Sequence, residues 1–184
     1  PGGSPFNSAI ASARLGVDSA FLGKVSTDFF GDQIWDALQS NGVSCRFALR
    51  SDQPSTLAFV KKSPTGEARY AFFAEHAAPR HPLPGDLPSF DSSVSAIQIG
   101  SISLIPDPVG ATIEGLVERE HVQRVISIDP NIRQSLITDE TKHRARLARL
   151  FERATIVKVS DEDLVWYNGD GDLEAGAREL LRTG

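Results

Sequence analysis

Apolar and polar positions in the first part of the chain follow a helical period, then a strand, then a helical period again. The apolar face of the first predicted helix consists of Phe6, Ala9, Ile10 and Ala13. Gly16 can close this helix in a left-handed conformation. The apolar run 19–25 predicts a short buried strand, and apolar positions within 30–38 predict a second amphipathic helix that ends at Asn41-Gly42.

The next part of the chain has the pattern of an all-β insertion. Segments 45–49, 56–62 and 68–74 each read as a strand, and Ser63-Pro64-Thr65-Gly66 is a good hairpin loop between the last two. We expect these three strands to form one small β-layer inserted into an α/β protein.

After the insertion, strands alternate with helices up to the last residue. One predicted strand lies within 94–104, and two more are 125–129 and 155–159. The predicted helices are 108–120, 138–154, 160–169 and 172–184. The helix 138–154 has an apolar side that contains His143, Leu147, Leu150 and Phe151 and is expected to be packed. The last helix is expected to bury Leu173, Ala177, Leu180 and Leu181. This alternation predicts a parallel sheet with helices on both faces, which is an α/β fold.

Composition narrows the classes of function. The chain has 184 residues, 40% of them hydrophobic, and a net charge of −5 without a basic stripe, so it suits one globular domain and argues against a nucleic-acid partner. The single cysteine, Cys45, excludes a disulfide framework and fits a reducing compartment, which predicts a cytoplasmic protein. No apolar run is long enough for a membrane span, so no membrane partner is expected.

Polar residues follow each of the three predicted C-terminal strands. They are Gly100-Ser101, the segment Asp129–Arg133 and the segment Ser160–Asp163. Because ligands of a parallel α/β sheet bind beyond the carboxyl ends of the strands, these three ends are expected to meet at one site.

The segment Asp129-Pro130-Asn131-Ile132-Arg133 is the richest of the three. An acceptor, an amide and a forked cation together suit polyol hydroxyls or a phosphate. An Asp/Asn turn that satisfies its own backbone, with Arg133 on the surface, explains the same residues. The spacing leaves both interpretations open.

Ser160 and Asp163 have the spacing of a capping box at a helix start, which explains them without function. In the functional alternative, Lys158 lies near a phosphate and an acid holds a water on Mg²⁺. Similarly, Gly2 and Gly3 can form a simple turn, or can let the backbone approach a ligand closely.

Several segments, in order, resemble the ribokinase-type (PfkB) carbohydrate kinases, in particular the fructokinase and 2-keto-3-deoxygluconate kinase group. GGSPFNSAIASARLG followed by FLGKVSTDFFGDQIWDALQSNGV is similar to the first motif region of this family. PSTLAFVKKSPTGEARYAFF resembles its lid strands, IQIGSISL its strand beside the sugar, DPNIR its fructokinase motif, and IVKVSDEDL its segment that orders magnesium and phosphate. The resemblance covers essentially all of 1–184 and implies a doubly wound, mostly parallel sheet with a small β-sheet lid at about 45–74.

The resemblance also implies roles for individual residues. Those expected to bind the sugar are Gly2, Gly3, Asn7, Gln98, Ser101, Asn131 and Arg133. Those expected to order phosphate and Mg²⁺ are Asp129, Lys158, Ser160 and Asp163, with Asp163 holding the metal through water. The family's Gly-Ala-Gly-Asp segment, which carries the general base, is not found within 1–184. We therefore expect the sugar-binding part of a longer kinase, truncated at both ends and without its nucleotide-binding C-terminal part.

The function implied is transfer of the γ-phosphate of ATP, with Mg²⁺, to a primary hydroxyl of a small sugar, fructose before 2-keto-3-deoxygluconate and before ribose or a nucleoside. A homodimer through the lid is expected as well. Two alternatives stay open at this point. One is a sugar-binding relative that has lost its chemistry, and the other is a purely structural domain whose polar strand ends are caps and turns.

Overall fold

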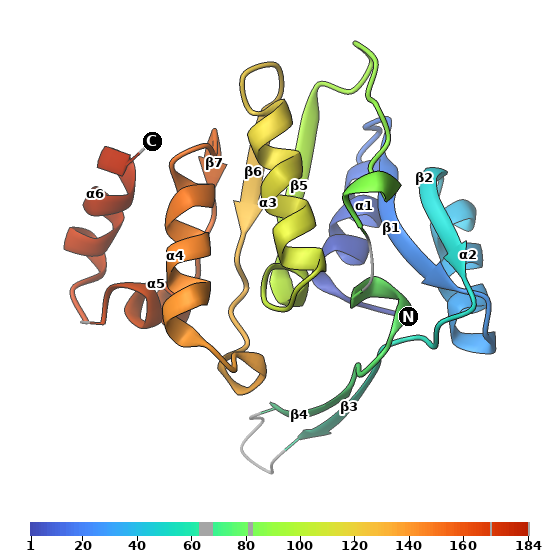
Figure 1. The fold of residues 1–184 in the computed structure, drawn as a ribbon, viewed down its shortest axis with the longest axis horizontal. Coiled ribbons are helices and arrows are strands. Elements are labelled where there is room, and N and C mark those ends of the chain that lie inside the picture. The colour runs from blue at the N-terminus through green and yellow to red at the C-terminus, as the bar shows by residue number, and fades with distance from the viewer. Residues whose placement is uncertain (63–67, 81–82, 170, 184) are drawn as a thin grey trace. The chain divides into compact units, whose positions relative to one another are not determined.

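The computed structural model describes residues 1–62, 68–80, 83–169 and 171–183 (Figure 1). The chain divides into two compact units. The first contains Pro1–Gly2 and Phe6–Pro82, and the second contains Gly3–Pro5 and Leu83–Gly184. The predicted hairpin loop Ser63-Pro64-Thr65-Gly66 lies outside the described residues.

The first unit opens with the predicted helix, strand and helix. Its elements are α1 (Ser4–Arg14), β1 (Ala20–Ser26), α2 (Phe29–Ser40) and β2 (Ser44–Ser51). Phe6, Leu38 and Val43 form a buried cluster, against which the predicted apolar face of α1 and Cys45 also pack. Gly16 and Gly42 adopt the left-handed conformations expected at the helix ends, with φ of 86° and 78°.

The pairing of β2 corrects one expectation from the sequence. Residues 45–49 were expected to share a layer with the two following strands, but β2 pairs in parallel with β1, with Gly23 opposite Ala48. Only β3 (Leu57–Lys62) and β4 (Ala68–Phe73) form the antiparallel hairpin. The helix α2 explains the difference, because a helical crossover returns the chain in the direction that parallel pairing requires.

The second unit is built on a three-stranded parallel sheet. Its strands are β5 (Ala96–Gly100), β6 (Val125–Asp129) and β7 (Ile156–Val157), in the order β5-β6-β7. Between them run α3 (Val109–Glu120) and α4 (Glu140–Phe151), which lie in front of the strands in Figure 1. Right-handed crossovers in this strand order place both helices on the same face of the sheet. Ile126 and Ile128 of β6 and Leu147 of α4 are fully buried.

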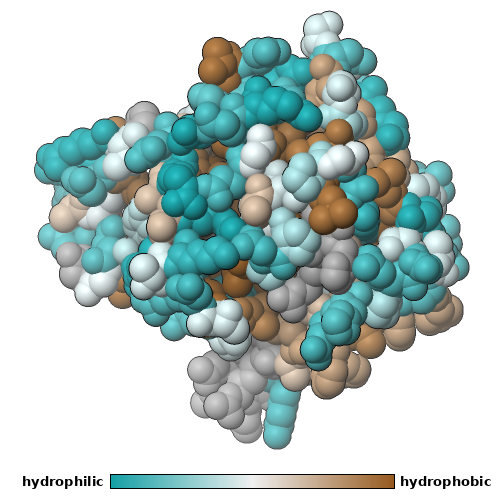
Figure 2. Space-filling model, viewed as in Figure 1, coloured by the Kyte–Doolittle hydropathy of each residue, from teal (hydrophilic) through white to brown (hydrophobic). Residues whose placement is uncertain are grey.

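The helices α5 (Asp161–Asn168) and α6 (Leu173–Thr183) follow β7. The expectation that α6 buries Leu173, Ala177 and Leu181 is wrong for the described part of the chain, because all three are exposed and Leu181 is 80% exposed. Only Gly176 of α6 is buried. Leu180, the fourth residue of that expectation, is half-buried, and α6 packs against α5 at Gly176. Figure 2 shows apolar residues in brown at the surface, between polar ones.

The described helices are all too short or too polar to cross a lipid bilayer.

The carboxylate of Asp28 joins three segments of the first unit. It caps α2 by accepting a hydrogen bond from the Gly31 N–H (2.8 Å), and it accepts two more from the N–H and hydroxyl of Ser55, both at 2.7 Å. Burial opposes ionisation of this group, but the hydrogen bonds from Ser55, Gly31 and Ser26 outweigh it and lower the pKa of Asp28 from 3.8 to about 2. The segment before β3 is thereby fastened to the start of α2.

We expect Asp28→Asn to reduce the free energy of unfolding by about 1 kcal/mol at neutral pH, because the cap and the charged acceptor are weakened. Since the pKa is lower in the folded state, this contribution is present above pH 3.8 and is lost as the pH falls toward 2. Urea unfolding of both proteins at several pH values from about 6 down to about 2.5 measures this contribution. A difference from wild type that stays constant with pH would contradict this origin. Asp36→Asn, an exposed change on α2, is the control.

Candidate functional site

The carboxyl ends of β5 and β6 lie against each other at Gly100. These strands pair in register up to Gly100 opposite Asp129. A Cβ atom added to Gly100 would lie 1.9 Å from the backbone oxygen of Asp129, so only glycine permits this approach. The predicted convergence of the two strand ends is therefore present in the second unit.

Two residues without a glycine's freedom adopt left-handed backbone conformations at these strand ends. Ser101 has φ of 65° and Asn131 has φ of 40°. The Ser101 N–H donates a hydrogen bond to the Pro130 carbonyl at 3.1 Å, which joins the two turns. Such conformations cost free energy and concentrate at binding and catalytic sites.

The carboxylate of Asp129 lies beside the third strand end. Its Oδ2 is 3.2 Å from the Nζ of Lys158, whose side chain is 62% exposed. Its Oδ1 is buried and has no hydrogen-bond partner among the described residues. The Lys158 N–H donates to the Ile128 carbonyl at 2.8 Å, so the backbone of this lysine continues the pairing beyond β7. The exposed ammonium of Lys158 can contact an anion from the solvent side while it stays paired with Asp129.

The side chain of Arg133 folds back over its own turn. Its Nη1 donates to the carbonyls of Ile132 (3.0 Å) and Asn131 (3.4 Å). This is close to the turn interpretation of the segment, although Arg133 is half-buried and not fully on the surface. Asn131 is also half-buried, and no hydrogen bond of its side chain fixes that turn among the described contacts.

Ser160 and Asp163 form the capping box that their spacing predicts. The Ser160 hydroxyl accepts from the Asp163 N–H (3.1 Å), and the Asp163 Oδ2 accepts from the Ser160 N–H (3.3 Å). The second oxygen of Asp163, Oδ1, accepts from the Ile132 N–H at 2.8 Å. This bond was not predicted, and it ties the start of α5 to the turn after β6. Asp163 is thus a buried structural link within the candidate site.

The remaining predicted residues lie on other parts of the chain. Gly2 and Gly3 precede α1, and Gly3 has φ of 123°, a backbone conformation that residues with side chains rarely adopt. Asn7 is exposed in the early part of α1. Gln98 is exposed on β5, and its Nε2 donates to the Ile99 carbonyl at 3.0 Å.

The sequence of this chain matches the model of a known protein family. The family model described as "pfkB family carbohydrate kinase" matches residues 1–183. The chain belongs to the pfkB family of carbohydrate kinases. The family resemblance that the sequence motifs indicated is confirmed.

Relatives within the pfkB family include several fructokinases. The chain is 43% identical over 183 residues to a fructokinase from Rhizobium leguminosarum bv. trifolii, covering 100% of this chain and 56% of the relative. It is 32% identical to fructokinase-2 of Solanum lycopersicum, covering 95% of this chain and 54% of the relative. The chain thus spans about half the length of the curated relatives it matches.

Solved pfkB-type structures confirm the expected ribokinase-like α/β fold. The fructokinase from Vibrio cholerae O395 in its fructose, ADP and calcium ion bound form superposes with a TM-score of 0.87 at 26% identity, covering 100% of this chain and 60% of that one. The ATP-bound fructokinase from Xylella fastidiosa gives a TM-score of 0.86 at 27% identity, covering 98% and 57%.

The residues of this pfkB chain suit a phosphate better than a directly bound metal. Within the described residues there is no group of three or more His, Cys, Asp or Glu side chains that could hold a metal ion. Both oxygens of Asp163 already accept backbone hydrogen bonds. The ammonium of Lys158 has the charge and the exposure to meet a phosphate oxygen.

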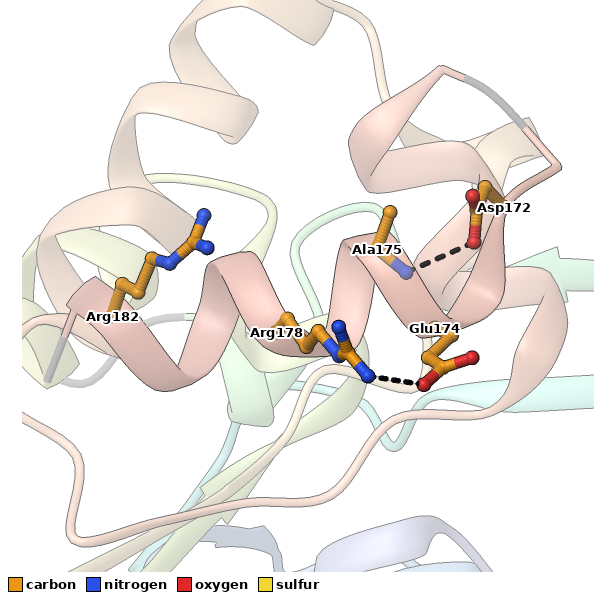
Figure 3. Close-up of a pocket in the computed structure, with 5 residues that line it drawn as sticks. All are labelled: Asp172, Glu174, Ala175, Arg178 and Arg182. Carbon is orange, nitrogen blue, oxygen red and sulfur yellow. Dashed lines mark hydrogen bonds and ion pairs between the residues drawn. The ribbon is translucent and has the colours of Figure 1, made fainter.

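Two surface hollows of this pfkB chain contain none of the predicted site residues. The first, of about 280 Å³, lies along α6, where Arg178 pairs with Glu174 at 2.6 Å and the Ala175 N–H donates to Asp172 (Figure 3). The second, of about 550 Å³, is lined by Gln134, Asp161, Glu162, Val165, Trp166, Gly171 and Leu173. The first is the side of a single helix with internally paired charges, so it supports no binding function.

Sequence reasoning missed one residue of this region, Arg146. Its side chain is only 3% exposed, and its Nη1 donates to the carbonyl of Leu104, shortly after Ser101. The available signal was its position on α4, three residues after His143 and beside Leu147, on a helix face that the apolar pattern predicted to be buried. A charged residue on such a face requires partners.

We expect Asp163→Ala to reduce the free energy of unfolding by about 2 kcal/mol, because it removes the carboxylate that accepts from the Ser160 N–H in the capping box and leaves the buried Ile132 N–H without an acceptor. Equilibrium unfolding in urea measures the loss. Asp161→Ala, an exposed acid in the same helical turn, should cost no more than about 0.5 kcal/mol. Equal losses for the two variants would show that the Asp163 bonds contribute nothing beyond the helix dipole.

Proposed function

We propose that the complete protein is an ATP-dependent sugar kinase that transfers the γ-phosphate to a primary hydroxyl of fructose. The observation that carries this proposal is the pair of left-handed turns at Ser101 and Asn131, joined by the Ser101–Pro130 hydrogen bond. These turns place a hydroxyl, an amide and the Asp129 carboxylate at the carboxyl ends of adjacent parallel strands, where ligands of α/β sheets bind.

The donors and acceptors at these turns suit a polyol. Hydroxyl groups of a sugar need both donors and acceptors, and Ser101, Asn131 and Gln98 each supply both. Arg133 adds a cation to the same turn, although its Nη1 is already engaged by the backbone. We assign sugar binding to these four residues, together with Gly2, Gly3 and Asn7 at the start of the chain.

Lys158 and Asp163 are assigned to the phosphate side of the site. In phosphoryl transfer, catalysis consists mainly of positioning and of stabilising the charge on the transferred group. The exposed ammonium of Lys158 would contact phosphate oxygens, with Asp129 setting its position, and Asp163, held by Ser160, would orient a metal-bound water. Mg²⁺ would arrive with ATP and screen its phosphates. The general base is assigned to a part of the complete protein other than these residues.

Fructose is favoured over the other sugars by the names of the relatives. The curated relative with 43% identity is a fructokinase, and the Vibrio cholerae structure is described with fructose and ADP. We therefore propose fructose ahead of 2-keto-3-deoxygluconate and of ribose or a nucleoside.

ADP release from the complete protein, in the presence of Mg²⁺ and ATP, tests the function. The sugars to compare are fructose, ribose, 2-keto-3-deoxygluconate and adenosine. Release with fructose alone is the expected result. No release with any of them, from a folded protein, would overturn the kinase proposal, and a thermal shift with fructose in that case would indicate a binding protein without chemistry.

The sugar-binding assignment has its own test in Asn131→Gly. Glycine accepts the left-handed φ of 40°, so this change removes the amide without straining the turn. We expect the KM for fructose to rise at least about tenfold, as for loss of one hydrogen-bonding partner of the substrate, while the KM for ATP is unchanged. Ser135→Ala, an exposed neighbour, is the control. Unchanged fructose affinity would favour the purely structural turn.

We also propose that the β3–β4 hairpin pairs two copies of the protein. Phe59 and Phe73 stack edge to face with centroids 5.6 Å apart, and they remain 61% and 63% exposed. A two-stranded sheet with an exposed apolar face is stable only when something covers that face. Sedimentation of the complete protein as a dimer, with monomers for Phe59→Ser, is the expected result, and a monomeric wild type would exclude this pairing.

A further inference from the structure

The guanidinium of Arg146 is the most extensively bonded buried cation of the second unit among the described residues. Its Nη1 donates to the carbonyls of Leu104 and Ile105, both at 3.0 Å, and its Nη2 contacts the Asp107 carboxylate at 2.5 Å. Its Nε is 3.4 Å from Glu114 of α3. A buried charge is tolerated only with such partners, so the surroundings of Arg146 are built around it.

Other groups are arranged to accommodate this arginine. A Cβ added to Gly110 would lie 2.2 Å from the Nη1 of Arg146, so the absence of a side chain there leaves room for the guanidinium. His143, one turn earlier on α4, is buried as well, and its Nδ1 has no hydrogen-bond partner among the described residues. Within the described contacts of α4, Arg146 therefore binds the end of the short 3₁₀ helix η3 (Ser101–Leu104).

The opposite end of η3 is attached to the candidate site. The Ser101 N–H donates to the Pro130 carbonyl, and the Ser103 hydroxyl donates to the Gly100 carbonyl at 2.7 Å. The segment between Gly100 and Asp107 is thus held at its first residue by the turn after β6 and at its last residues by Arg146. A short segment fixed at both ends cannot rotate or shift, whereas one fixed only at its first residue can.

We propose that Arg146 is a positioning residue for the sugar site, which sets the place of the Ser101 hydroxyl by fixing the far end of η3. This inference rests on the proposed sugar-kinase function. Arg146 itself touches no substrate. Its loss releases the Leu104 and Ile105 carbonyls and leaves the Asp107 and Glu114 carboxylates with one partner fewer each.

The test compares Arg146→Met with Arg149→Met in the complete protein. Arg149 also pairs with Glu114, but it is half exposed and bonds no carbonyl of η3 within the described residues, which makes it a matched control. Amide hydrogen exchange is the first measurement. We expect the Ser101–Ile105 amides to exchange at least about tenfold faster in Arg146→Met and to be unchanged in Arg149→Met.

Sugar kinetics are the second measurement. We expect the KM for fructose to rise about tenfold in Arg146→Met with the KM for ATP unchanged, since the defect lies on the sugar side. Gly110→Ala, whose Cβ displaces the guanidinium, should give the same pattern and replaces Arg146→Met if that variant does not fold. Wild-type exchange at Ser101 and a wild-type fructose KM in a folded variant would overturn the inference.

The two proposals fail in different ways. If wild-type protein releases no ADP with any sugar, the kinase function is wrong, and the exchange rates alone then decide whether Arg146 fixes η3. If wild type is an active kinase and the variants behave like Arg149→Met in both measurements, the function stands and the role of Arg146 is wrong.

Discussion

Gly100→Ala is expected to destabilise the protein by about 3 kcal/mol and to remove sugar binding in the complete protein. The new Cβ would lie 1.9 Å from the backbone oxygen of Asp129 and 2.8 Å from its carbonyl carbon. Both are main-chain atoms of the adjacent strand, so no side-chain rotation relieves the overlap. The ends of β5 and β6 must separate, and this movement displaces Ser101 and the turn that contains Asn131.

Urea unfolding and fructose affinity measure the two effects of Gly100→Ala. Gly115→Ala is the control, because no atom lies within 4 Å of a Cβ added at this exposed position of α3. That change should stabilise the protein by about 0.5–1 kcal/mol, since alanine is the better helix former. A Gly100→Ala variant with wild-type stability would show that the two strand ends are not in contact.

Leu147→Ala is expected to reduce the free energy of unfolding by about 3 to 4 kcal/mol. Leu147 has no exposed surface and lies on α4, the helix that packs on the parallel sheet of the second unit. Truncation removes apolar burial and leaves a cavity that rigid strands cannot fill. Equilibrium unfolding with a fixed m-value measures the loss.

The matched control is Leu181→Ala on α6, the same chemical change at a side chain that is 80% exposed. It should alter the free energy of unfolding by no more than about 0.5 kcal/mol. A loss comparable to that of Leu147→Ala would show that the apolar side of α6 is covered in the complete protein, as the sequence pattern predicted.

Local sequence signals predicted most of the elements correctly. The helix ends at Gly16 and Asn41-Gly42, the capping box of Ser160 and Asp163, and the buried face of α4 all depend on residues close together in the chain. Hydrogen bonds and apolar periodicity within one element are local, so their signals survive without tertiary information. The two-strand hairpin of β3 and β4 was predicted for the same reason.

Errors arose where the partner of an element decides its environment. The residue pattern of β2 is compatible with pairing either to β1 or to the β3–β4 hairpin. Only the crossover through α2 selects β1 as its neighbour. The apolar side of α6 is recognisable from periodicity, but periodicity does not say what covers it. Arg146 was missed because an arginine in a polar-rich helix looks solvated until the carbonyls of η3 are placed beside it.

The sequence by itself determined the family, the alternation of strands and helices, and which strands are followed by polar residues. Motifs and apolar periodicity depend only on the order of residues along the chain. Only the tertiary structure decided which of those residues meet. The contact of Gly100 with Asp129, the bond from Ile132 to Asp163 and the partners of Arg146 each join residues at least 29 positions apart. Pairings at that separation depend on strand register and helix packing, which no local pattern encodes.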